Sequence, residues 1–242
     1  MLSDPATPRP RDPATSPSPV QGFVPWAALL LDLDGTLVES EPKHAAAHIR
    51  FLATQGIALT EADCFSNIGK GDRSFYAEVM KTHGRHDDPV AWVAAKTRTL
   101  ISLYHDEGLA LRPGVESLLA RAAAAGTPCM VVTSAERALA QAALHVTRLA
   151  QRLPMVIAHE DVDKHKPDPF PYLLAASRLG VPIQRCLVIE DSPTGVRAGV
   201  ASGATCVGVP GLVPAAALRA AGAHHLVARI DAAWDVAPQG HG

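Results

Sequence analysis

Short, almost wholly apolar runs recur along this chain, and they constrain its fold more than any other feature. The first run spans 27–31 and ends directly in Asp32. Similar runs lie at 128–132, 155–158, 186–189 and 204–209, with a weaker sixth at 226–228. Runs of this length without polar alternation are typical of strands buried on both faces, as in a parallel sheet.

Helix-like stretches separate most of these runs. They cover 115–125, 135–150, 169–179 and 194–201. The third opens with Pro169 and is followed by Gly180, the usual asymmetry of helix ends. Strands that alternate with helices form βαβ units. The sequence therefore predicts an α/β core with a doubly wound, Rossmann-like parallel sheet.

One long stretch breaks the alternation. Between residues 41 and 112 we find helical patterns at 44–55, 74–82 and 89–104, and no convincing strand. Thr60 and Asp63 resemble a capping box that starts a further helix. We therefore predict a helical cap domain at 41–112, inserted into a core made of 26–40 and 113–242, with hinges at 38–42 and 108–113.

The first 25 residues differ from the rest, because seven of them are proline and Ser, Thr, Ala and Asp fill most of the gaps. Such a segment buries too little apolar surface to offset its ordering entropy. We predict a disordered tail at 1–25.

Charge and cysteine content exclude several classes of protein. The 22 Lys and Arg residues nearly balance 24 Asp and Glu, so neither a nucleic acid nor a membrane is expected as a partner. The four cysteines form no CxxC pair, which favours reduced, buried thiols. No apolar run is long enough to span a membrane, and no secretion signal is evident. We expect a cytoplasmic protein that is a monomer or a weak homodimer.

Two carboxylates follow the first apolar run. Asp32 and Asp34 alternate along an extended chain, which places them on the same side. Two carboxylates held close together repel, so they need a shared proton or a cation such as Mg²⁺. The alternative is an ordinary Asp-Gly turn at the end of a strand.

Three further polar motifs follow later runs. Thr133 and Ser134 offer groups that bind phosphate oxygens, although they could equally cap the next helix. Lys166 can neutralise a phosphate, or it belongs to an ordinary loop. Glu190 and Asp191 can complete the oxygen shell of a metal, or they form a solvated acidic loop beside a capping Ser192 or Thr194.

Taken in order, the motifs Asp-x-Asp-Gly-Thr, Thr-Ser, Lys-Pro and Glu-Asp-Ser-x-x-Gly resemble the haloacid dehalogenase superfamily. The resemblance covers about residues 29–209, and the helical insert looks like that superfamily's C1-type cap. The most similar group is the β-phosphoglucomutase and phosphoglycolate-phosphatase-like branch.

This resemblance implies a role for each motif residue. Asp32 would be the nucleophile that forms an aspartyl-phosphate, and Asp34 the general acid and base, with its backbone carbonyl on the metal. The remaining roles are a sharp turn at Gly35, a phosphoryl clamp of Thr133 and the backbone of Ser134, a bridging Lys166, a metal ligand in Asp191 and metal support from Glu190, directly or through water.

The resemblance also implies that the cap selects the substrate. The loop 69–73 would close over the site, with Lys70 and Arg73 touching the substrate, and His44 matches a histidine at the cap hinge. The alternatives are a solvent-exposed turn and an ordinary exposed helix histidine.

The predicted function is a Mg²⁺-dependent phosphatase of a small phosphorylated metabolite, of the sugar phosphate or phosphoglycolate type. One alternative is a sugar phosphomutase, which returns the phosphoryl group to a sugar instead of to water. A second is a non-catalytic binding protein on the same fold. The presence of Asp34 argues against a dehalogenase, which lacks this acid/base by family pattern.

Overall fold

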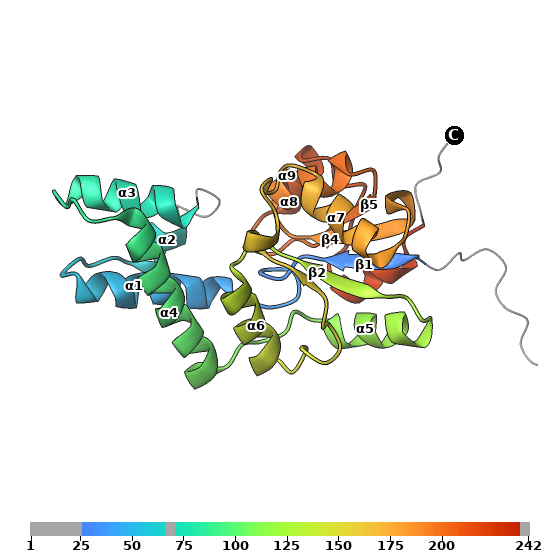
Figure 1. Ribbon diagram of the computed structural model, residues 1–242, viewed down its shortest axis with the longest axis horizontal. Helices are drawn as coiled ribbons and strands as arrows, with labels where there is room; N and C mark the ends of the chain where they lie inside the picture. The colour runs from blue at the N-terminus through green and yellow to red at the C-terminus, as the bar shows by residue number, and fades with distance from the viewer. Residues whose placement is uncertain (1–25, 66–70, 238–242) are drawn as a thin grey trace, which may run out of the picture.

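A six-stranded sheet, parallel throughout, forms the centre of the computed structural model, which describes residues 26–65 and 71–237 (Figure 1). Its strand order is β3-β2-β1-β4-β5-β6. The strands are β1 Ala28–Leu31, β2 Cys129–Val132, β3 Val156–Ile157, β4 Cys186–Glu190, β5 Thr205–Gly208 and β6 His225–Leu226. Each of the six predicted runs contains or overlaps one of these strands.

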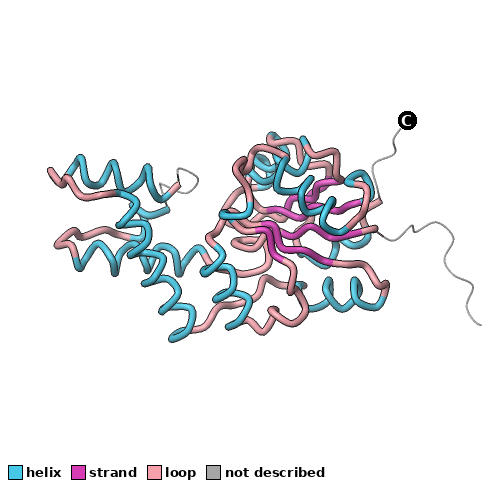
Figure 2. Tube along the Cα trace, in the orientation of Figure 1, coloured by secondary structure: helices cyan, strands magenta, loops and turns pink. Residues whose placement is uncertain are grey.

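Alternate residues of the strands are buried on opposite faces of the sheet. In β1, Leu29 and Leu31 belong to one apolar cluster, whereas Ala28 and Leu30 belong to another. Helices α5 and α6 cover the first face, and α7, α8 and α9 cover the second (Figures 1 and 2). Because both faces are covered, no position in β1 tolerates a polar side chain, which explains the unbroken apolar run.

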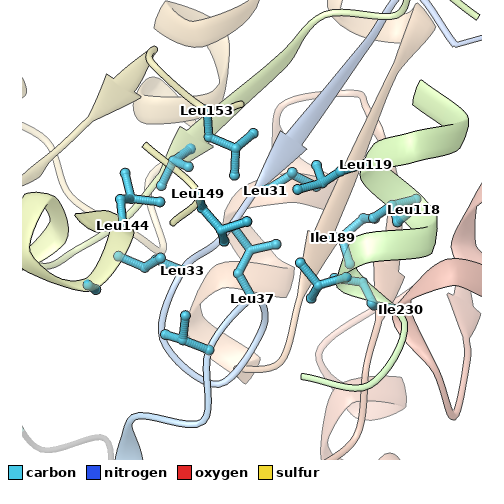
Figure 3. Close-up of a cluster of buried hydrophobic side chains, with 14 of the residues drawn as sticks. Leu31, Leu33, Leu37, Leu118, Leu119, Leu144, Leu149, Leu153, Ile189 and Ile230 are labelled. Atoms are coloured by element: carbon cyan, nitrogen blue, oxygen red, sulfur yellow. The ribbon is translucent and has the colours of Figure 1, made fainter. Parts of the chain in front are cut away.

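The larger cluster joins the sheet to α5. Figure 3 shows Leu31 and Ile189 from neighbouring strands beside Leu118 and Leu119 of α5. Burying one such side chain fully stabilises the fold by roughly 1.5–3 kcal/mol. This packing fixes β1 and β4 next to each other, and therefore also the polar residues that follow them.

The core helices lie close to the predicted stretches. They are α5 Val115–Ala124, α6 Arg137–Val146, α7 Phe170–Leu179, α8 Pro193–Ala201 and an unpredicted α9 Ala215–Ala220, with 3₁₀ turns at His159–Asp161, Ile183–Arg185 and Ile230–Asp235. The predicted helix 135–150 is shorter at both ends. It starts late because Glu136 has extended backbone angles, and soon after its end Arg148 adopts a left-handed conformation with φ of 61°.

The insert consists of α1 Glu41–Thr54, α2 Glu61–Phe65, α3 Asp72–Thr82 and α4 Pro89–Glu107, grouped at one end of the molecule (Figure 1). In the described part of 41–112 the backbone forms no strand beyond a single bridge at Leu111. The capping box is confirmed, since the Thr60 amide donates to Asp63 Oδ2 at 2.8 Å and the Asp63 amide to Thr60 Oγ1 at 3.3 Å. The insert has its own apolar cluster, which includes Phe51, Tyr76 and Trp92.

Two short segments connect the insert to the core, and they lie side by side. Val38 pairs with Leu111, and the Glu39 amide donates to the Ala110 carbonyl at 2.9 Å. The C-terminal half of α4 also reaches into the core cluster through Leu103 and its neighbours. The predicted fold class, a doubly wound parallel sheet with an inserted helical cap, is confirmed. The exact division into 26–40, 41–112 and 113–242 stays a prediction.

The proposed tail at 1–25 lies outside the described residues. Over the part of the chain that the structure describes, we find no helix with the length and apolar character needed to cross a bilayer. The four cysteines are free thiols, three of them buried.

Candidate active site

Polar groups gather where β1 and β4 end, at the centre of the sheet. In the order β3-β2-β1-β4-β5-β6 the connections reverse direction between these two strands. Open α/β sheets bind ligands at the carboxyl ends of strands at such a reversal. A cavity of about 800 Å³ lies here, lined by core residues such as Asp32 and by residues of α1, α3 and α4. Its size suits a small organic ligand.

Lys166 connects three of the predicted motifs. Its Nζ lies 2.7 Å from Asp32 Oδ1, 2.6 Å from Glu190 Oε1 and 2.8 Å from the Val132 carbonyl oxygen. An ammonium has three N–H donors, and these partners use all of them. The lysine that sequence patterns left as a possible loop residue is therefore a fixed, buried cation beside Asp32.

Glu190 is fully buried and holds Lys166 in place. Its Oε1 also accepts a hydrogen bond of 2.7 Å from the Tyr172 hydroxyl, and its Oε2 accepts one of 3.0 Å from the Ser192 hydroxyl. The solvated acidic loop is therefore wrong for Glu190, although Ser192 does cap α8 through the Gly195 amide. A side chain at Gly195 would overlap this carboxylate, because its Cβ would lie 1.7 Å from Glu190 Oε1.

Three carboxylates form the one group of potential metal ligands found among the described residues. Oxygens of Asp32, Glu190 and Asp191 all lie within 4.8 Å of one another. Thr36 Oγ1 donates to Asp191 Oδ1 at 3.3 Å. Gly35 has φ of 74°, and a Cβ there would lie 2.0 Å from Asp191 Oδ2, so glycine is required both by its backbone and by its neighbour.

The electrostatics of this group fit a divalent cation. Burial, followed by repulsion from Glu190, raises the pKa of Asp32 to about 8 despite the nearby Lys166. Burial and repulsion from Asp32 raise the pKa of Asp191 well above its ordinary range. Crowded carboxylates of this kind are relieved by a cation, and hard oxygen ligands suit Mg²⁺.

The side chain of Asp34 points elsewhere, toward the hinge. Its Oδ1 lies 3.8 Å from Nε2 of His44 on α1. Burial acts to raise the pKa of Asp34, but His44, Ser40 and Lys96 outweigh it, so that the pKa lies below its ordinary value. The Asp34 carboxylate does not belong to the group of three carboxylates. The family resemblance assigns its backbone carbonyl, not its side chain, to the metal.

Thr133 and Ser134 lie at the end of β2 and line the cavity. Thr133 is buried, and its hydroxyl accepts a 3.0 Å hydrogen bond from the Ala135 amide. The interpretation that they cap the next helix is wrong, because Glu136 occupies the N-cap position of α6. Both residues therefore line the cavity without serving as the N-cap of α6.

On the cap side, His44 and Arg73 line the cavity, and Lys70 lies outside the described residues. His44 is not an ordinary exposed histidine: its Nδ1 lies 2.9 Å from Nζ of Lys96 on α4. Lys96, which is 1% exposed, was not among the residues predicted from the sequence. Its position four residues after Trp92 and four before Leu100, both on the buried face of α4, is the signal that could have found it.

Comparison with known proteins agrees with this geometry. The family model for haloacid dehalogenase-like hydrolases matches residues 26–203, most of the chain. This chain belongs to the haloacid dehalogenase-like hydrolase family. The prediction that it is a hydrolytic enzyme of this family is thereby confirmed.

Among relatives in the family, the chain is 35% identical to hexitol phosphatase A of Escherichia coli, over 74% of this chain and 81% of the relative. It is 33% identical to a phosphoglycolate phosphatase of Yersinia pseudotuberculosis, over 74% and 78% respectively. The crystal structure of CbbY from Rhodobacter sphaeroides with phosphate matches 87% of this chain and 100% of that chain, at 27% identity and a TM-score of 0.74.

Proposed function

We propose that this hydrolase is a Mg²⁺-dependent phosphatase of a small phosphorylated metabolite, of the sugar phosphate or phosphoglycolate type. The observation that carries the proposal is the Lys166 ammonium, held between Asp32 and Glu190 beside the three clustered carboxylates. This arrangement supports the proposal, because it brings a positive charge next to the carboxylate proposed as the nucleophile, and both residues line the cavity.

In the first step, a carboxylate oxygen of Asp32 attacks phosphorus, and the bond from phosphorus to the ester oxygen breaks. Asp34 gives its proton to the leaving oxygen, and an aspartyl-phosphate remains on Asp32. Lys166 reduces the repulsion between the carboxylate and the phosphate dianion. The Thr133 hydroxyl and the backbone at Ser134 hold the equatorial oxygens.

In the second step, water attacks the phosphorus of the aspartyl-phosphate. Asp34 takes the water proton, inorganic phosphate leaves, and the Asp32 carboxylate is restored. Asp34 must be protonated in the first step and ionised in the second, and its lowered pKa favours the ionised state that the second step needs.

Asp32, Asp191 and the Asp34 carbonyl would hold the magnesium ion, with Glu190 in support. When bound, the ion supplies positive charge that offsets the charge of the phosphoryl group. Glu190 already has Lys166, Tyr172 and Ser192 as partners, which favours an indirect, supporting role.

The relatives support the substrate class. Both the hexitol phosphatase and the phosphoglycolate phosphatase are phosphatases by name, and each aligns with about three quarters of this chain. His44 and Arg73 on the cap side of the cavity are proposed to contact the part of the substrate that is not transferred, together with Lys70. A cytoplasmic location and a monomeric or weakly dimeric state complete the proposal.

The test is phosphate release from p-nitrophenyl phosphate in the presence of Mg²⁺. The wild type should release phosphate, and Asp32→Asn, which keeps the size of the side chain, should abolish release while its circular dichroism spectrum stays unchanged. Equal rates in the two proteins would remove Asp32 from the mechanism. A wild type that converts a sugar 1-phosphate into its 6-phosphate without release would favour the mutase instead.

A further inference from the structure

The cap side of the cavity presents a carboxylate that the proposed chemistry does not use. Asp72 is the first residue of α3, and it lines the cavity with 35% of its side chain exposed. Its Oδ2 accepts a 2.9 Å hydrogen bond from Lys96 Nζ, and its Oδ1 lies 3.5 Å from His48 Nε2. A carboxylate accepts about four hydrogen bonds, so acceptor positions remain free toward the cavity.

Lys96 is already committed to partners within the cap. Its ammonium contacts His44 Nδ1 and Asp72 Oδ2, both at 2.9 Å, and is almost completely buried. Because an ammonium only donates, His44 must accept at Nδ1. The positive charge of Lys96 is balanced by the negative charge of Asp72.

His48, which lies beside Asp72 on the cap side of the cavity, adds no positive charge there. Its Nδ1 lies 2.8 Å from the Tyr76 hydroxyl, and burial lowers its pKa below the ordinary value. Asp72, in contrast, stays ionised: burial acts to raise its pKa, but His48 and Lys96 outweigh burial and lower it strongly. The cap side of the cavity therefore contains the ion pair of Lys96 and Asp72, in which the partly exposed Asp72 oxygens can still accept hydrogen bonds.

We infer that the cap wall formed by Asp72, Lys96 and His48 selects phosphate monoesters whose other end carries neutral hydroxyl groups, and disfavours those with a second anionic group. The inference rests on the proposed phosphatase function and narrows its substrate class. Hydroxyl groups donate to Asp72 without adding charge, whereas a carboxylate or a second phosphate meets its negative oxygens.

The other charged residues around the cavity also disfavour a second anionic group on the substrate. Its acidic residues are Asp32, Asp34, Glu41, Asp72, Glu136 and Asp191. Among the described cations that line it, Lys96 and Lys166 are both held in ion pairs. Arg73 is the remaining described cation of the lining, and it is the described residue to which an anionic tail would bind.

The experiment measures binding, so it does not depend on turnover. Asp32→Asn protein with Mg²⁺ is titrated by calorimetry with sorbitol 6-phosphate, 2-phosphoglycolate and inorganic phosphate. Sorbitol 6-phosphate should bind at least tenfold more tightly than 2-phosphoglycolate. Adding Asp72→Asn should reduce this preference at least fivefold and leave inorganic phosphate unchanged, whereas the control Asp106→Asn, on an exposed part of α4 that does not line the cavity, should change neither.

Equal or tighter binding of 2-phosphoglycolate would overturn the inference, and so would a preference that survives Asp72→Asn. If 2-phosphoglycolate binds more tightly and this preference disappears in Arg73→Gln, then Arg73 binds the anionic end of the ligand and the inference is wrong. The comparison of ligands in Asp32→Asn needs no cap variant, so equal or tighter binding of 2-phosphoglycolate overturns the inference even if Asp72→Asn fails to fold. Failure of the wild type to hydrolyse any phosphate ester would reject the proposed function, a result distinct from the ratio of the two affinities.

Discussion

Adding a single methyl group at Gly195 should disturb both the stability of the fold and the active site, because it would overlap the buried carboxylate of Glu190. In Gly195→Ala, the new Cβ would lie 1.7 Å from Oε1 and 1.9 Å from Cδ of Glu190. Both distances are far below contact distance, so the buried carboxylate must move. Movement breaks its contacts with Lys166 at 2.6 Å and Tyr172 at 2.7 Å.

The expected loss of stability follows from these contacts. Leaving one partner of a buried ion pair unpaired costs about 3–5 kcal/mol. Replacing a helical glycine by alanine returns up to about 1 kcal/mol, because glycine loses more backbone entropy on folding. We therefore expect a net loss of about 2–4 kcal/mol. We also expect at least a ~100-fold lower kcat, because Lys166 loses its support and small misplacements of catalytic groups have effects of that size.

Gly199→Ala is the matched control, one turn later in α8. Its Cβ would lie 2.8 Å from Val188 Cγ1 and 3.0 Å from Cys206 Sγ, with no site residue among these neighbours. Overpacking of this kind costs roughly 1–3 kcal/mol. Urea unfolding gives the stability of each variant, and p-nitrophenyl phosphate hydrolysis gives the activity of the folded protein. The reasoning is refuted if Gly195→Ala keeps wild-type stability and activity, or if both variants lose activity equally.

Three further predictions follow from the same contacts. Tyr172→Phe leaves one hydrogen bond to the buried Glu190 unmade and should lower the free energy of unfolding by about 1–3 kcal/mol, measured in urea, whereas an unchanged midpoint would contradict the role of the phenol. EDTA should abolish p-nitrophenyl phosphate hydrolysis and added Mg²⁺ should restore it, and full activity in EDTA would remove the metal from the mechanism. Because the folded-state pKa of Asp72 lies below its ordinary 3.8, its stabilising contribution is complete above that pH and is lost as the pH falls toward the folded pKa. The melting temperature should accordingly fall less steeply below pH 4 in Asp72→Asn than in the wild type. If the melting temperatures of the two proteins fall in parallel, Asp72 does not have a lowered pKa in the folded state.

Much of the site follows from the sequence because strand ends in a parallel sheet share one edge. The apolar runs before Asp32, Thr133 and Glu190 fix three strands, and covering helices on both faces make those runs unmistakable. The helical insert could also be predicted, since helical spacing and a Thr60 capping box are local signals. Lys166 could be assigned to the site only from the resemblance of the four motifs to a known family, because a Lys-Pro loop by itself does not indicate a catalytic residue.

What the sequence by itself determined is therefore the sheet, the insert and the edge at which the acidic residues meet. Only the tertiary structure decided that Asp34 turns to His44, and that Lys96 lies buried between His44 and Asp72. Asp72 and His44 are 24 and 52 positions from Lys96 along the chain, and the three residues come from three different helices. Local patterns report the face that a helix buries, whereas the partner of a buried charge depends on how separate helices pack, and that is settled only when the whole chain folds.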